Sequence, residues 1–153
     1  MSSLSDDAAA AILETVPLVM REIRRQMRSQ MGPEISVPLF RIMGYLSRHP
    51  GASLTDVADH MGLTPPSVSK MVDGLVERGL VLRVAATEDR RRIELALTPA
   101  GSDLLGAAYT HTKKQISKML EALESEELLQ LIECLNKLHS IVTTETSTTG
   151  KRK

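Results

Sequence analysis

Two short amphipathic segments lie back to back between residues 53 and 79, and this arrangement constrains the fold more than any other feature of the chain. In the first segment, Ser53 and Asp56 have the spacing of a capping box, and Gly62 can adopt the left-handed conformation that ends a helix. Only one residue later, Thr64 is a predicted N-cap followed by proline and a second apolar repeat. Two short helices joined by a tight, glycine-containing turn make a helix-turn-helix.

A β-hairpin is predicted directly after the second of these helices. Apolar residues alternate in two short runs on either side of a polar and charged loop, residues 85–92. Such alternation indicates strands with one buried face, and on this pattern the buried face carries Leu80, Leu82, Val84, Ile93, Leu95 and Leu97.

Helical periodicity also surrounds this central region. A first helix is expected over about residues 5–31, with Ser5 as its N-cap and with a kink or break at Pro17. After the hairpin, Thr98 is a predicted N-cap for a long helix, and a last helix extends to Val142. The sequence therefore predicts a mainly α fold with a small β-hairpin wing (α+β). One domain spans residues 1–142, with a winged helix-turn-helix head at about 35–98 and dimerisation helices at about 5–31 and 99–142. Residues 143–153 are expected to form a polar, disordered tail.

The distribution of charge separates the central region from the C-terminal part of the chain. Nineteen basic and nineteen acidic side chains cancel over the chain, but residues 21–92 hold twelve Lys or Arg against eight Asp or Glu, whereas residues 93–150 hold four against eight. A positive region is what phosphate binding needs. With two Tyr, one Phe and no Trp, the chain lacks the stacking surfaces of single-strand binders, so duplex DNA is the favoured nucleic acid.

The second helix of a helix-turn-helix enters the major groove with its N-terminal residues at the base edges. With its apolar stripe turned inward, the residues predicted to face DNA are Thr64, Pro66, Ser67, Ser69 and Lys70, and Asp73 lies further along the same outer face. In the hairpin loop, Arg90, Arg91 and Arg92 can enter a narrow minor groove, where the negative potential is enhanced.

Together these residues resemble a known family. The run from Asp89 to Gly101, DRRRIELALTPAG, is similar to the MarR signature, in which Asp-x-Arg is followed by a strand and then by Leu-Thr-x-x-Gly. Upstream, LTDVA, SVSKMV and LVERGLV resemble that family's helix-turn-helix. The resemblance implies a transcriptional regulator, in many cases a ligand-responsive repressor. Arg91 would reach the minor groove, and Asp89 would brace the wing by pairing with an arginine.

The resemblance also implies partners. A homodimer built from the first and the last two helices would read an inverted repeat, and a small aromatic or phenolic anion would release the DNA. No residue of the sequence identifies such an effector, and no other cofactor is expected. Independently, the apolar stripes of residues 104–123 and 128–142 would leave a large exposed patch on a monomer, which favours a dimer.

Other classes of function have less support. The four histidines lack metal-ligand spacing, the single cysteine, Cys134, is expected to be a packed thiol, and no catalytic motif is present, so neither a metal site nor an enzyme is expected. No membrane span or signal peptide is predicted, so we expect a cytoplasmic protein. The main alternative is a winged-helix protein-interaction module without sequence-specific DNA binding, and arginines at the wing tip argue against it.

Overall fold

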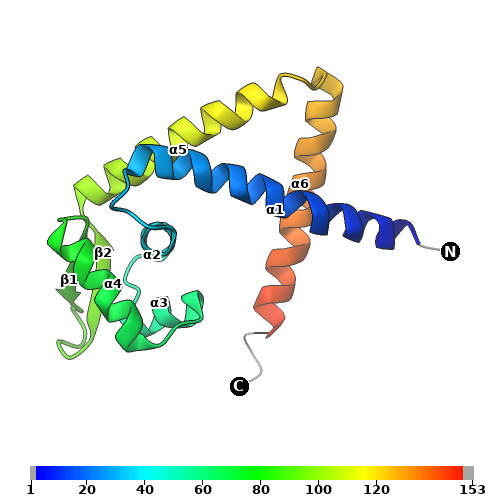
Figure 1. Ribbon diagram of the computed structural model, residues 1–153. Helices are drawn as coiled ribbons and strands as arrows, with labels where there is room; N and C mark the ends of the chain where they lie inside the picture. Colours follow the sequence, from blue (N-terminus) through cyan, green and yellow to red (C-terminus); the bar gives the residue numbers. More distant parts are fainter. Residues whose placement is uncertain (1–2, 150–153) are drawn as a thin grey trace. The chain divides into compact units, whose positions relative to one another are not determined.

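A computed structural model of the protein describes residues 3–149, with side chains described to residue 144. Figure 1 shows the elements, which in chain order are α1 (Leu4–Met31), α2 (Val37–Arg48), α3 (Leu54–Met61), α4 (Pro65–Glu77), β1 (Val81–Ala85), β2 (Ile93–Leu97), α5 (Pro99–Leu120) and α6 (Ser125–Thr149). The chain forms two compact units, the first ending at Lys114 and the second beginning at Gln115. The predicted winged helix-turn-helix order of helices and hairpin is confirmed.

Local capping explains where the helix-turn-helix begins and turns. The Ser53 hydroxyl accepts a hydrogen bond from the Asp56 backbone N–H at 3.1 Å, and the Asp56 carboxylate accepts one from the Ser53 N–H at 2.8 Å, so the predicted capping box is present. Gly62 ends α3 in the left-handed conformation, with φ 67°. Thr64 occupies the N-cap position of α4, but its hydroxyl bonds to the Ser67 hydroxyl at 2.9 Å instead of capping the backbone.

The core of the first unit lies between α2, α3, α4 and the hairpin. Its largest fully buried side chains come from all of these elements and are Ile42, Met43, Val57, Val68, Val72, Leu75, Val81 and Leu95. The inward positions of α4 are the ones that the apolar repeat predicts, so the opposite side of α4 is left facing solvent. The Leu95 N–H donates to the Ala52 carbonyl at 2.8 Å, which ties the entrance of α3 to the hairpin.

The prediction for the buried face of β1 is wrong by one residue. Strands β1 and β2 pair antiparallel with Val81 opposite Leu97 and Arg83 opposite Leu95, so Val81 and Leu95 share the core face. Leu82 and Val84 lie on the other face and are half exposed, and Ile93 near the loop is exposed as well. Leu80 is buried because it lies in the turn before β1, where the period-two rule does not yet apply.

A tight junction connects the end of α4 with the start of α5. The Thr98 hydroxyl donates to the Gly79 carbonyl at 2.6 Å and accepts from the Gly101 N–H at 3.0 Å, which confirms Thr98 as the N-cap of α5. The Thr98 N–H donates to the Leu80 carbonyl at 3.0 Å. Gly101 is buried against that same carbonyl, and a Cβ atom at Gly101 would overlap its oxygen.

Helix α1 begins earlier than the sequence analysis predicts. The N-cap is Ser3, which forms a capping box with Asp6, whereas Ser5 lies inside the first turn. Both serines precede acidic residues, but only Ser3 has the three-residue spacing that the reciprocal bonds need. Pro17 lies inside one continuous helix, so the predicted break is not present.

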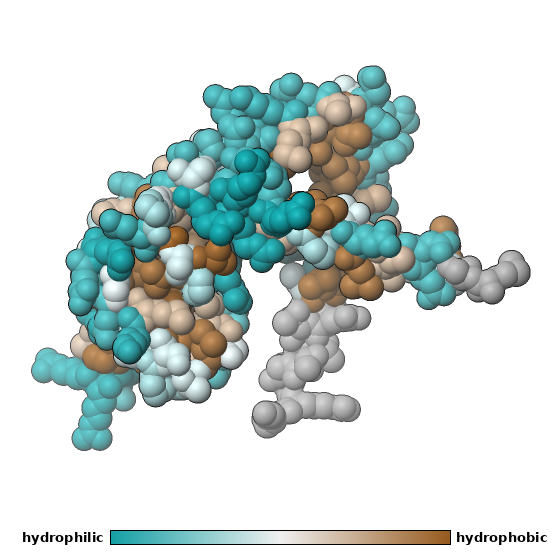
Figure 2. All heavy atoms as spheres, in the orientation of Figure 1, coloured by the Kyte–Doolittle hydropathy of each residue, from teal (hydrophilic) through white to brown (hydrophobic). Residues whose placement is uncertain are grey.

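The long helices expose much of their apolar surface. In α1, every residue from Leu4 to Met20 is exposed, and in α6 no described side chain is buried. Figure 2 shows hydrophobic side chains at the surface of both helices. Cys134 on α6 is exposed, whereas a packed thiol was expected. Within residues 3–149, no helix is long and apolar enough to cross a membrane.

Helix α6 also extends past the predicted end of the last helix. It continues from Val142 to Thr149, where the sequence predicts a disordered tail beginning at residue 143, and residues 150–153 lie outside the described residues. The Thr143 and Thr144 hydroxyls donate to backbone carbonyls of the preceding turn, so these polar side chains are accommodated on the helix.

Candidate nucleic-acid interface

The N-terminal half of α4 presents the residues predicted to face DNA. Thr64, Pro66, Ser67 and Lys70 are exposed, and Ser69 is half-buried at the flank. Because Val68, Val72 and Leu75 hold the opposite side of the helix in the core, this exposed surface has a fixed orientation. It offers hydroxyl groups and one ammonium group, which suit phosphate oxygens and base edges.

The wing loop is closed by its own backbone. The Ala86 N–H donates to the Arg92 carbonyl at 2.9 Å, and the Arg92 N–H donates to the Asp89 carbonyl at 3.0 Å. The Asp89 carboxylate accepts from the Arg91 backbone N–H at 2.9 Å. Asp89 therefore does stabilise the loop, but as a turn-forming side chain. Within residues 3–149 it makes no ion pair with an arginine, so the predicted form of the brace is wrong.

The three arginines of the wing have different surroundings. All are exposed, and Arg90 and Arg91 make no side-chain ion pair within residues 3–149. Arg92 lies 3.8 Å from the Asp56 carboxylate at the start of α3. The pKa of Asp56 is below its usual value, mainly because the Ser53 backbone and then the Ser53 side chain form hydrogen bonds with the carboxylate. The charge of Arg92 lowers it further. The carboxylate therefore stays ionised and attracts Arg92. Arg90 and Arg91 are therefore the wing cations most available to an external phosphate.

One ion pair at this surface was not foreseen from the sequence. The Arg83 guanidinium on β1 donates to the Asp73 carboxylate on α4, with 2.6 Å between Nη2 and Oδ1. Asp73 was placed on the outer face of α4 by helical spacing, but nothing in the sequence pattern indicates that Arg83 reaches it across ten residues. The pair joins α4 to β1 at the base of the wing.

A pocket of about 510 Å³ opens on another side of the first unit. It is lined by aromatic and apolar side chains together with cationic ones, among them Phe40, Arg41, Arg48, His60, Leu105 and Tyr109. Within residues 3–149, neither of the two arginines makes an ion pair with an acid. No sequence motif indicates this pocket, because its residues come from α1, α2, α3 and α5.

A stack of three rings adjoins the pocket. The Tyr45 ring stacks on both histidines, with its centroid 4.2 Å from that of His49 and 4.4 Å from that of His60. Desolvation of the ring, and then the positive charges of Arg41, Arg48 and His49, lower the pKa of His60. The positive charges around the pocket thus disfavour protonation of the His60 ring.

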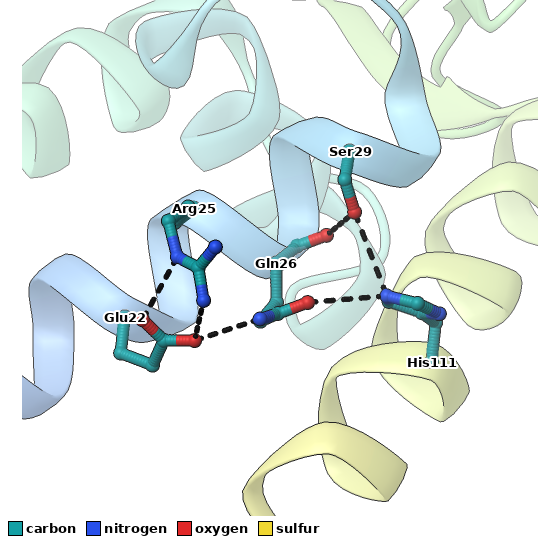
Figure 3. Close-up of polar contacts among 5 residues, drawn as sticks. All are labelled: Glu22, Arg25, Gln26, Ser29 and His111. Atoms are coloured by element: carbon teal, nitrogen blue, oxygen red, sulfur yellow. Dashed lines mark hydrogen bonds and ion pairs between the residues drawn. The ribbon is translucent and has the colours of Figure 1, made fainter.

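Helices α1 and α5 of the first unit are joined by polar contacts, which Figure 3 shows. The Gln26 amide donates to Glu22 at 2.7 Å, and its oxygen lies 3.2 Å from His111 Nε2. Hydrogen bonds from Arg25 and then Gln26 lower the pKa of Glu22 to about 2, so the carboxylate is ionised. Arg25 is thereby paired within its own helix.

Comparison with known proteins places the fold and the helix-turn-helix in one family. A sequence profile of the MarR family matches residues 35–92. The HTH-type transcriptional repressor MdtR of Bacillus subtilis (strain 168) is 27% identical over 150 residues, which are 97% of this chain and 96% of MdtR. Among solved structures, RV1404 from Mycobacterium tuberculosis aligns with a TM-score of 0.77 at 25% identity, covering 100% of this chain and 99% of that one. The helix-turn-helix and hairpin of this chain therefore resemble those of the MarR family over residues 35–92.

The fold of the chain also agrees with that of a solved protein of lower sequence identity. A MarR family protein from Bacillus stearothermophilus aligns with a TM-score of 0.77 at 20% identity, covering 92% of this chain and 99% of that one. The predicted fold class is therefore confirmed, and the MarR signature acquires a structural meaning here. Its aspartate closes the wing turn, and its threonine and glycine form the junction between α4 and α5.

Proposed function

We propose that this chain is a transcriptional repressor of the MarR family that binds duplex DNA, with α4 in the major groove and the wing in the minor groove. The observation that carries the proposal is that two exposed groups of polar and cationic side chains lie in the same compact unit. One is on α4, with Ser67 and Lys70. The other is on the wing, where Arg90 and Arg91 make no ion pair with an acid among the side chains described to residue 144. MdtR, which is similar to this chain over nearly its whole length, is named a transcriptional repressor, and this supports the same role.

The proposal includes a homodimer that reads an inverted repeat. Its support is the apolar surface of the long helices: Leu13 is 75% exposed, and Leu129 on α6 is 68% exposed. Apolar stripes exposed to water raise the free energy of the monomer, and a second copy offers the same stripes in a self-complementary form. Two recognition helices related by a two-fold axis contact half-sites whose centres are about one helical turn, roughly 10 bp, apart.

The proposal also includes release of DNA by a small aromatic anion bound in the pocket of the first unit. The lining supports this ligand class because Arg41 and Arg48, which have no acidic partner within residues 3–149, attract a carboxylate or phenolate, while Phe40 and Tyr109 offer faces to a ring. A ligand that releases DNA must bind the DNA-incompetent arrangement more tightly than the competent one.

Binding measurements with matched variants test the DNA-binding role. Duplexes selected from genomic fragments are titrated with the parent protein, Arg91→Ala and Lys113→Ala, an exposed lysine on α5 outside the proposed interface. Arg91→Ala should weaken binding to most sequences and reduce the slope of log K against log salt by about 0.9 for each subunit, about 1.8 for the dimer, because each phosphate neutralised contributes about 0.9. Lys113→Ala should bind like the parent.

Two results would count against the DNA-binding role. If the parent protein binds no duplex with sequence preference, the alternative of a protein-interaction module gains support. If Arg91→Ala binds all duplexes as tightly as the parent, the wing does not contact DNA.

A further inference from the structure

The outer face of α4 carries an acid where a polyanion is expected to bind. Asp73 comes three residues after Lys70, so the two side chains are neighbours on one face of the helix, and the Asp73 side chain is 54% exposed. A carboxylate on a surface that approaches phosphates is unfavourable unless its charge is neutralised or its oxygens are used in recognition. Asp73 meets the first condition, because Arg83 on β1 donates to its Oδ1 atom.

The ion pair leaves acceptor and donor capacity on the solvent side. Among the side chains of residues 3–144 and the backbone of the described residues, no donor bonds to the Oδ2 atom of Asp73, and Arg83 uses one of its five N–H groups on Asp73. The contact fixes the direction of a short side chain from two rigid elements, a helix and a strand. Asp73 is therefore an oriented acceptor with its net charge balanced.

From this geometry we infer that Asp73 is a specificity-determining residue of the recognition helix and that Arg83 is its positioning residue. The inference rests on the proposed DNA-binding function. In the major groove, the only base-edge donors are the amino groups of cytosine and adenine, whereas guanine and thymine present acceptor oxygens. A carboxylate at this position selects a base pair whose amino group faces Asp73 and rejects the pair that places a carbonyl there.

The test compares base preference among variants that carry the same change of charge. In a duplex selected by the parent protein, each half-site position is replaced in turn by each of the four bases. These duplexes then compete for binding to Asp73→Asn and, separately, to Glu77→Gln. Glu77 is an exposed acid on the same helix that makes no ion pair within the described residues. Asp73→Asn should lose roughly 10- to 100-fold of discrimination at one position per half-site, because an amide donates as well as accepts. Glu77→Gln should keep the parent's preference.

The role of Arg83 is tested in the same competition. Arg83→Gln should weaken discrimination at that same position, since Asp73 loses its orientation, and Arg83→Lys should restore part of it by restoring the charge. A purely structural contact would change the melting temperature or overall affinity but would leave the base preference at that position unchanged.

The possible failures are distinguishable. If Asp73→Asn retains the base preference of the parent, or binds every duplex more tightly by the same factor, Asp73 only repels phosphates and the inference is wrong. If only Arg83→Gln retains it, the positioning role of Arg83 is wrong. If the parent itself shows no base preference, the proposed function fails before the variants are compared.

Discussion

Two glycines of α5, five residues apart, should respond in opposite ways to the same substitution. Gly101 is the glycine of the MarR signature and is buried, whereas Gly106 is exposed and has open space where a Cβ atom would lie. We expect Gly101→Ala to destabilise the protein and Gly106→Ala to stabilise it.

The magnitudes are set by the contacts at each position. A Cβ atom at Gly101 would overlap the Leu80 carbonyl oxygen and lie 3.1 Å from its carbon, so this backbone must move. Moving it weakens the hydrogen bond from the Thr98 N–H, which contributes about 1 kcal/mol, and repacks the buried Leu80 side chain at a cost of about 1–3 kcal/mol. We therefore expect a loss of about 2–4 kcal/mol. Gly106→Ala should gain up to about 1 kcal/mol from helix propensity alone.

Urea denaturation followed by circular dichroism, at one fixed protein concentration because a dimer's stability depends on concentration, measures both changes. Unfolding of Gly101→Ala at the same urea concentration as the parent would show that the Leu80 carbonyl adapts without cost. The close approach would then not explain why glycine stands at this position.

Three further outcomes are expected. Leu135→Glu, which places a charge on the exposed apolar face of α6, should reduce the mass measured by light scattering from that of a dimer to that of a monomer, and an unchanged dimer mass would place the interface elsewhere. Ser53→Ala should cost about 0.5–2 kcal/mol in urea denaturation by removing the α3 capping box, and a stability equal to the parent's would contradict this role of the hydroxyl. Because the pKa of His60 is lower in the folded protein than in the unfolded chain, the unfolded chain binds more protons, so stability should fall as pH decreases below about 6.5. His60→Gln should make that fall shallower between about pH 7 and 5, and an identical pH profile would refute the contribution of His60.

Much of the helix-turn-helix was predictable because its signals are local. The Ser53 capping box, the left-handed Gly62 and the N-cap at Thr98 each depend on residues within one turn, and each is present as predicted. The inward stripe of α4 is set by helical spacing in the same way, so the outward residues Ser67 and Lys70 could be chosen from sequence.

The errors occur where a second element decides. Alternation in β1 gives two possible faces, and the pairing with β2 and the packing on the core select the one that carries Val81. The partner of Asp73 lies on a different element, and the pocket is assembled from four helices, so neither leaves a periodic signal. Asp89 was assigned a charged partner by family resemblance, whereas a backbone N–H two residues away satisfies it locally.

The junction at Thr98 has a mechanical consequence. The Thr98 hydroxyl bonds both to Gly79, in the turn that follows α4, and to Gly101, in the first turn of α5, while the Thr98 backbone N–H donates to the Leu80 carbonyl. Three hydrogen bonds at one residue couple the first turn of α5 to the segment that follows α4, so we expect these two parts of the first unit to move together. A change of direction in α5 should then occur beyond its first turn and leave the orientation of α4 on the core unchanged.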